Sequence, residues 1–209
     1  MKMKWWEKSV EYAFVLRHVK EEALIAPLSG PEERAGDAVF QIDESFILIE
    51  FKRSDAELDS EQSKFANGKY EEAYSQLYGR DSHHLLVYGK QDEADFDLHA
   101  GTYFSGRPVS LSSKLPGLPK EDFIKYMQLF LGFKVGAGSS GSGGSSLIAG
   151  VNEAGNVIGV MSNEEFIVKY LPEFVPPQLE SEVGSDQEPK AGFSPGMKQA
   201  SAVNRPKWR

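Results

Sequence analysis

The chain has 209 residues, 40% of them hydrophobic and 26% charged, an ordinary composition for a globular protein with a packed core. It contains no cysteine, which excludes disulfides, thiolate zinc sites and cysteine nucleophiles and suits a reducing cytosol. The net charge of −8 argues against non-specific DNA binding, because proteins that hold DNA by its phosphates usually display clustered Lys and Arg.

The N-terminal residues begin like a signal peptide, but charged residues from Glu7 onward interrupt any apolar stretch. No apolar run approaches the length needed to span a bilayer. We therefore expect a cytoplasmic protein with no membrane partner.

The first third of the chain predicts a helix followed by strands. Apolar residues recur near helical spacing over Trp5–Leu24, with Glu and Lys on the other side. A short strand at Leu24–Leu28 precedes the breaker Gly30-Pro31. The segment Asp37–Arg53 is rich in β-branched and aromatic residues and predicts two strands joined by a tight turn at Glu44-Ser45.

The middle of the chain predicts helices alternating with short strands. The polar segment Asp55–Gly79, with scattered apolar residues, predicts a helix or a broken pair of helices. His83–Tyr88 predicts a short buried strand, and a second strand is expected around His99–Phe104. After Pro119, a broad apolar stripe over Phe123–Phe133 predicts another helix.

The C-terminal part begins with a Gly/Ser run at Gly136–Ser146, which is typical of a flexible loop. Leu147–Val151 and Val157–Val160 flank a turn segment and predict a hairpin. Ser162 is the expected N-cap of a short helix that ends near Tyr170.

These elements predict four parts. Residues 1–135 form an α/β core, 136–146 a Gly/Ser-rich loop, and 147–171 a hairpin plus short helix that packs on the core as an extension. Residues 172–209 are rich in Pro, Gly, Ser and charge, which predicts a disordered tail.

The hairpin predicted at Asp37–Arg53 gathers charged side chains at one end. In its register, Gln41 lies opposite Leu48 and Asp37 opposite Lys52. Glu50 is expected on the face shared by that second pair. The other face of the hairpin is wholly apolar and comprises Ala38, Phe40, Ile42, Ile47, Ile49 and Phe51. A one-residue slip of the pairing would mix the two faces and bury charge, so this apolar face favours the register.

Two carboxylates and an ammonium at one sheet end have a specific chemical use. The oxygens of Asp37 and Glu50 are ligands that Mg²⁺ takes together with phosphate and water. A metal held there polarises a scissile phosphate and lowers the pKa of a bound water. Lys52 beside it can orient or deprotonate that water and offset developing charge.

Asp37, followed by Glu50-Phe51-Lys52 at the end of the next strand, resembles the signature of the PD-(D/E)XK nuclease superfamily. The order of elements over Trp5–Lys90 is also similar to the core of that superfamily. The resemblance implies an α/β (α+β) fold with a restriction-endonuclease-like core, in which helices flank a mixed β-sheet. It also implies metal-dependent phosphodiester hydrolysis in defence, restriction or repair, with DNA favoured over RNA and Mg²⁺ (or Mn²⁺) as cofactor.

The resemblance also implies further site residues. An acid on the first helix often completes the metal site in this superfamily, which implies Glu11 first and Glu7 second. A Gln or Lys on the following helix lies near the phosphate in some branches, which implies Gln76 as a substrate-binding residue, or else Lys64. A homodimer or a partner subunit is compatible with cutting both strands.

Two other functions remain open at this point. A catalytically silent nuclease-like scaffold, acting as a protein-interaction subunit, fits the acidity and small size. An unrelated α+β binding module would make the motif accidental.

Two further motifs favour structural roles. His83-His84 is expected to be structural rather than a metal pair, because adjacent strand residues point to opposite faces. Gly136–Gly141 matches a dinucleotide fingerprint but lacks the preceding strand and the following helix.

Overall fold

A computed structural model of the protein describes residues 4–19, 45–65, 68–92, 95–134 and 146–175. Asp37 lies outside the described residues, as do the strand predicted at Leu24–Leu28 and the Gly136–Gly141 motif. Most of the segment predicted as a disordered tail, from residue 176 on, also lies outside them.

Seven strands of the described residues form one mixed sheet, in the order β4-β3-β2-β1-β6-β7, with β5 paired to β1 off this path. β1 and β2 are parallel, and the other pairs are antiparallel. The predicted mixed sheet flanked by helices is therefore confirmed. The strands are β1 (Ser45–Lys52), β2 (His84–Asp92), β3 (Asp95–Thr102), β4 (Pro108–Val109), β5 (Leu118–Pro119), β6 (Ser146–Val151) and β7 (Val157–Ser162).

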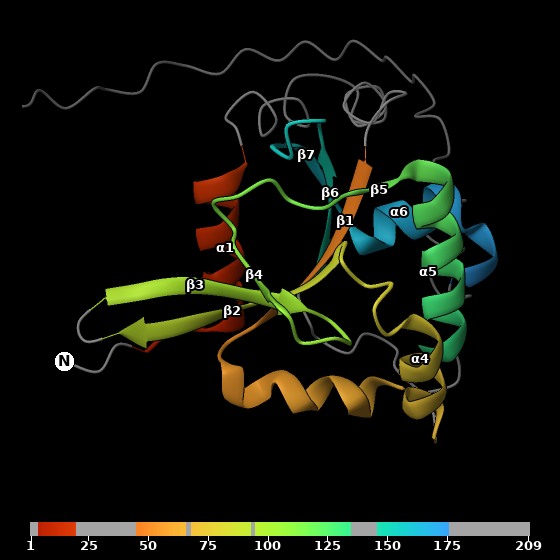
Figure 1. The fold of residues 1–209 in the computed structure, drawn as a ribbon, viewed down its shortest axis with the longest axis horizontal. Helices are drawn as coiled ribbons and strands as arrows, with labels where there is room; N and C mark the ends of the chain where they lie inside the picture. The colour runs from red at the N-terminus through yellow and green to blue at the C-terminus, as the bar shows by residue number, and fades with distance from the viewer. Residues whose placement is uncertain (1–3, 20–44, 66–67, 93–94, 135–145, 176–209) are drawn as a thin grey trace, which may run out of the picture. The chain divides into compact units, whose positions relative to one another are not determined.

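Helices cover both faces of this sheet, with α1 on one side of β1 and α5 on the other (Figure 1). The first helix is shorter than predicted, because the chain turns extended at Val19 and bridges to Val157. The helices are α1 (Glu7–His18), α4 (Lys69–Leu77), α5 (Lys120–Lys134) and α6 (Asn163–Tyr170), with 3-10 helices η2 (Asp55–Lys64) and η3 (Pro172–Phe174).

A helical crossover joins the parallel strands β1 and β2. Parallel neighbours cannot be joined by a tight turn, so the chain passes through η2 and α4 before it returns as β2. Of the two alternatives predicted for this segment, one helix or a broken pair, the structure has the pair, of which η2 is a 3-10 helix. Gly79, two residues after α4 ends, has a φ of 75°, a conformation that glycine adopts without a Cβ clash.

The strand predicted around His99–Phe104 belongs to a longer hairpin. It begins earlier, as β3, and pairs antiparallel with β2 from Leu85 opposite Thr102 to Asp92 opposite Asp95. The outer part of this hairpin is rich in polar residues and lacks a clear alternation of apolar and polar side chains, so its length could not be predicted from the sequence.

The predicted C-terminal hairpin and helix are confirmed as β6, β7 and α6. Ser162 Oγ accepts a hydrogen bond from the Glu165 backbone N–H at 3.1 Å, and Glu165 Oε2 accepts one from the Ser162 N–H at 2.7 Å. This reciprocal capping box fixes where α6 begins. Residues 147–171 were predicted as an extension that packs on the core, but β6 lies beside β1 inside the main sheet.

Both edges of β1 are occupied, which makes the predicted hairpin register wrong. Leu48, the predicted partner of Gln41, lies between His84 of β2 and Ile148 of β6. Glu50 likewise lies between Leu86 and Ser146. Hydrophobic alternation determines which face of a strand is buried, but it does not select the neighbouring strand.

The predicted faces of β1 are confirmed. Ile47, Ile49 and Phe51 pack under α1 in one hydrophobic cluster. Glu50 and Lys52 share the opposite face with Phe46 and Leu48, and that face is buried too.

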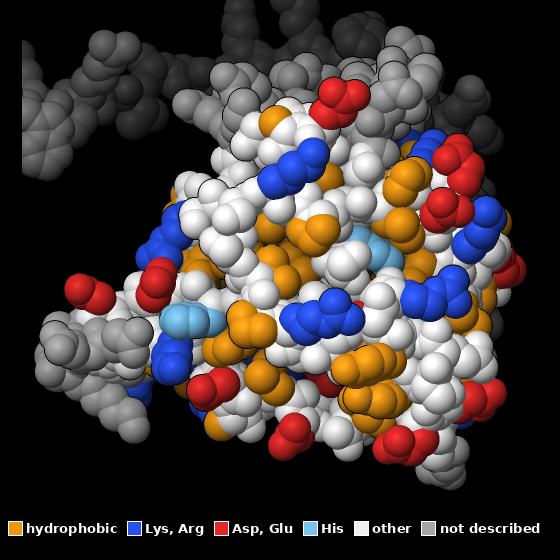
Figure 2. Space-filling model, in the orientation of Figure 1, with side chains coloured by type: hydrophobic (Ala, Val, Ile, Leu, Met, Phe, Trp, Pro, Cys, Tyr) orange, Lys and Arg blue, Asp and Glu red, His pale blue; other side chains and the backbone are white. Residues whose placement is uncertain are grey.

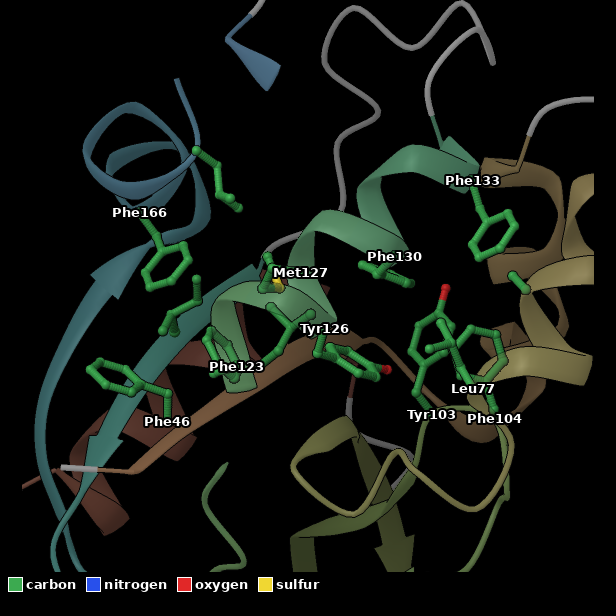
Figure 3. Packing of buried hydrophobic residues seen from close by; sticks show 14 of the residues in the cluster. Phe46, Leu77, Tyr103, Phe104, Phe123, Tyr126, Met127, Phe130, Phe133 and Phe166 are labelled. Carbon is green, nitrogen blue, oxygen red and sulfur yellow. The ribbon is translucent and has the colours of Figure 1, made fainter. Parts of the chain in front are cut away.

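The core on the Glu50 side is largely aromatic. The α5 side chains Phe123, Tyr126 and Phe130 point away from the helix into this core, between Phe166 and Tyr103 (Figure 3). Phe130 is 2% exposed and contacts several rings edge-on. Charged side chains that enter this layer are therefore surrounded by a low-dielectric environment.

Candidate functional site

Glu50 and Lys52 lie at the carboxyl end of β1, and both are buried. Their residues are 5% and 4% exposed. Glu and Lys are almost never buried to this degree unless they are paired. Their partners define the site.

Glu50 is contacted by ammonium groups from two other elements. Oε1 accepts a hydrogen bond from Lys134 Nζ at the end of α5, and Oε2 accepts one from Lys64 Nζ at the end of η2, both at 3.0 Å. His84 Nε2 lies 3.8 Å from Oε1. Burial alone would raise the pKa of Glu50, but Lys134, His84 and Lys64 together hold it well below its usual range.

Lys52 is bound by a second carboxylate. Its ammonium forms an ion pair with Glu61 and donates a hydrogen bond to Ser60 Oγ at 3.0 Å. The Tyr103 hydroxyl donates to Glu61 Oε2 at 2.8 Å. Lys64 Nζ lies 2.7 Å from Glu61 Oε1, so this ammonium joins the two carboxylates of the site. Burial lowers the pKa of Lys64, but the two glutamates outweigh it and raise that pKa overall.

These contacts form one buried ion cluster, which we call the Glu50 network. Among the described residues it holds three ammonium groups and two carboxylates, a surplus of one positive charge. His84 adds no charge near neutral pH, because burial lowers its pKa. The network consists of Glu50, Lys52, Glu61, Lys64 and Lys134.

The adjacent histidines both contact Tyr126, and this corrects the prediction that they point to opposite faces. His84 Nδ1 is 2.8 Å from the Tyr126 hydroxyl oxygen, and the His83 ring centroid is 4.3 Å from that of Tyr126. The alternation fails because β2 begins only at His84. Both imidazoles are buried among aromatic rings, which agrees with a structural role.

The burial of His83 predicts acid sensitivity. Burial, with a smaller contribution from His84, lowers the pKa of His83 to about 3. The unfolded chain takes up a proton near pH 6.5 and the folded chain does not, so stability falls as pH drops below about 6.5. We expect a loss of up to about 1.4 kcal/mol per pH unit from this group between pH 6 and 5. Urea unfolding of the wild type and of His83→Phe at several pH values measures it, and equal slopes would refute the assignment.

Two other predicted site residues, Glu11 and Gln76, lie apart from this network, and Asp37 lies outside the described residues. The Glu11 carboxylate accepts hydrogen bonds from Lys8 Nζ at 2.7 and 2.8 Å. Glu11 lies on α1, whose buried residues Val10 and Phe14 pack against the opposite face of β1. Gln76 is exposed on α4. Lys64 was the alternative to Gln76 as the residue expected near the phosphate, and its ammonium contacts Glu50.

Sequence reasoning missed Glu61 and Lys134. Glu61 lies three residues before Lys64, a spacing at which helical side chains meet, and this pattern could have indicated the pair. Lys134 has no local signal, because only the position of α5 across the sheet brings its ammonium to Glu50.

The predicted metal site can be compared with the ligands that this network offers. Mg²⁺ takes one or two carboxylates together with water and phosphate oxygens. Glu50 and Glu61 provide two carboxylates linked through Lys64. A bound cation would have to displace ammonium groups from them. The described residues contain no group of three His, Cys, Asp or Glu side chains that could hold a metal ion.

A solvent-accessible cleft of about 720 Å³ borders the network, since Glu61 and Tyr103 are among its lining residues. This volume lies within the usual range for small-molecule sites. Tyr70, Tyr88 and His99 also line it and present aromatic rings. The molecular face shown in Figure 2 has a hollow bordered by hydrophobic side chains, with acidic and basic side chains interspersed around it.

Comparison of the chain with protein-family models, curated proteins and solved structures found no match. Within the described ranges, no helix combines the length and apolarity that a membrane crossing needs.

Proposed function

We propose that the protein is a metal-dependent nuclease of the PD-(D/E)XK type, which hydrolyses phosphodiester bonds of nucleic acid with Mg²⁺ or Mn²⁺. DNA is the favoured substrate, and cytoplasmic defence, restriction or repair is the expected context. The observation that supports this most is the pair Glu50 and Lys52, side by side on one buried face at the carboxyl end of β1. The same strand is followed by helices and a parallel strand.

The finer fold assignment belongs to the proposal as well. A strand that ends in Glu-x-Lys, a helical crossover and a parallel strand resemble part of a restriction-endonuclease-like core. The sequence did not predict that β6 pairs with β1. Fold similarity alone would not establish function, so the proposal depends on the site.

In the proposed reaction each residue has a distinct task. Glu50, with Asp37 as the second expected ligand, would hold the divalent cation, and Glu61 is a further carboxylate that contacts the same Lys64 ammonium as Glu50. The cation, when bound, polarises the scissile phosphate and lowers the pKa of a water. Lys52 orients the attacking water and offsets negative charge as it develops. Glu61 and Ser60 position the Lys52 ammonium.

One observation favours a second candidate, the catalytically silent scaffold. Each carboxylate oxygen of Glu50 and Glu61 already contacts an ammonium or hydroxyl group. A network paired in this way can be purely structural. In that case the protein would serve as an interaction subunit, and its surface rather than this network would hold its function.

A cleavage assay separates the two candidates. We expect the wild type to cut at least one of linear, circular or single-stranded DNA, or RNA, with Mg²⁺ or Mn²⁺ and not with EDTA. Lys52→Met should lower the rate about 10²–10³-fold, because it removes a charge that acts on the transition state.

Lys125→Met is the matched control, because Lys125 is exposed on α5 and pairs only with nearby Asp122 among the described contacts. It should cut like the wild type. A folded wild type that cuts none of these substrates and shows no calorimetric metal binding would contradict the nuclease and leave the scaffold.

A further inference from the structure

We propose that the cleft beside the Glu50 network binds a planar, uncharged nitrogen heterocycle of the nucleobase type against the rings of Tyr88 and His99. The cleft would hold this ring by stacking and hydrogen bonds, without a metal ion and without a phosphate group. The assignment of the base to a nucleic-acid substrate rests on the proposed function.

The first observation is a pair of rings in the lining of the cleft. Tyr88 of β2 lies directly opposite His99 of β3, so both side chains leave the sheet on the same face. Their ring centroids are 5.9 Å apart, and their planes differ by 23°. Both residues line the cleft, and both are only partly buried. Two nearly parallel rings favour a flat ligand, because every base has a π-face that stacks on an aromatic side chain.

The second observation is the charge of the lining. Among the described residues that line the cleft are three carboxylates, from Asp59, Glu61 and Asp97, and one guanidinium, from Arg17, but no lysine. Arg17 is already paired with Asp97 at 3.0 Å. Such a lining repels phosphate and other anions, while its carboxylate oxygens accept hydrogen bonds from N–H groups. The cleft therefore favours a ligand that has N–H donors and no negative charge.

The neighbouring charges also disfavour a cation. Glu61 belongs both to the cleft and to the Glu50 network, and it already contacts the ammonium groups of Lys52 and Lys64. The described part of that network has one more ammonium than carboxylates. A further positive charge beside Glu61 would meet this surplus, and like charges repel most strongly where water is excluded. An uncharged ligand avoids this repulsion and can still donate to the exposed Asp59 carboxylate.

The third observation is the floor of the cleft beside the two rings. Leu86 and Gly101 lie directly opposite each other, on the face that carries the rings. Both line the cleft, and Gly101 adds no side chain to it, so a flat ligand on the rings can extend over this part of the sheet. Lys52 lies next to Tyr88 across the β1–β2 pair. The ligand would thus lie beside the Glu50 network and not inside it.

The fourth observation is an unpaired atom. His99 Nε2 is buried and has no hydrogen-bond partner among the described residues. Buried polar atoms in folded proteins are nearly always paired, so a hydrogen-bonding group is expected at this ring. A base edge carries both donors and acceptors, and it can therefore pair with the imidazole nitrogen in either tautomer.

Nucleosides test the proposal directly. We expect at least one of adenosine, guanosine, cytidine and uridine to bind the full chain in EDTA, measured by ligand-observed NMR titration. The matching nucleoside monophosphate should bind no more tightly, because the described lining offers its phosphate no lysine. Choline, a cation without a planar ring, should not bind. The proposal would be overturned by a protein that binds no nucleoside, or that prefers choline or the monophosphate to the nucleoside.

Two variants place the nucleoside in the cleft. Tyr88→Leu removes one ring and keeps much of the volume, so it should bind the nucleoside about tenfold more weakly. Gly101→Val adds a side chain to the floor and should weaken binding at least as much. A Cβ at Gly101 would meet only ordinary contacts, the nearest with the Arg107 carbonyl oxygen at 3.5 Å, so this variant is expected to fold even if Tyr88→Leu does not.

Tyr12→Leu is the matched control, because Tyr12 is 59% exposed on α1 and is not part of the described lining of the cleft. It should bind the nucleoside like the wild type. Wild-type affinity in either folded cleft variant would contradict the proposal.

The base site and the nuclease can fail separately. A single-stranded oligonucleotide should compete with the nucleoside if the base belongs to a nucleic acid. Nucleoside binding that Tyr88→Leu weakens, in a protein that neither binds the oligonucleotide nor cuts nucleic acid, would retain the base site and reject the nuclease. Metal-dependent cutting by a wild type that binds no nucleoside would do the reverse.

Discussion

Glu50→Gln is expected to abolish cleavage and to destabilise the protein by about 3–5 kcal/mol, the usual cost of removing one partner from a buried ion pair. The amide keeps the size of the side chain but leaves Lys64 and Lys134 without the carboxylate that both contact at 3.0 Å. Urea unfolding at pH 7 measures the stability, and the cleavage assay on folded protein measures the activity.

The double variant Glu50→Gln/Lys134→Met separates the two effects. It removes one negative and one positive charge, so the described network keeps the same surplus as in the wild type. We expect it to recover at least about 2 kcal/mol relative to Glu50→Gln, because contacting residues are not additive. It should still fail to cut. Restored cutting in this variant would show that Glu50 is structural rather than a metal ligand.

Phe130→Ala is expected to destabilise the protein by about 3–5 kcal/mol, the usual range for deleting a buried aromatic ring. Phe130 is 2% exposed and has ring contacts with Phe65, His84 and Tyr103. The same ring lies under the Lys134 ammonium at 4.2 Å. The substitution therefore removes core packing and one support of the Glu50 network together.

Phe130→Leu is the control for packing alone, since it fills much of the space without an aromatic face. We expect it to cost less stability than Phe130→Ala in urea unfolding while still weakening the hold on Lys134. Cleavage by folded Phe130→Leu at the wild-type rate would show that the ring is dispensable for the Glu50 network. A loss below about 1 kcal/mol in Phe130→Ala would contradict the burial of this side chain.

Several predictions made from local pattern agree with the structure. The α5 stripe, the β6–β7 hairpin and the Ser162 cap of α6 all depend on residues close in sequence. The same holds for the two faces of β1, where period-2 alternation places Glu50 and Lys52 together. These features follow from backbone geometry and side-chain polarity, which any short window of the chain contains.

Tertiary structure alone decided which elements meet. Alternation in β1 could not indicate that β2 and β6 occupy its two edges, because many strands satisfy the same pattern. The contact between Lys134 and Glu50 joins residues 84 apart in sequence, and the Tyr103–Glu61 hydrogen bond joins residues 42 apart. Such pairings reflect the packing free energy of the whole core, and no local window holds that information. The sequence by itself thus determined α5, the β6–β7 hairpin, the start of α6 and the faces of β1, and the packed core decided the partners of Glu50 and Lys52.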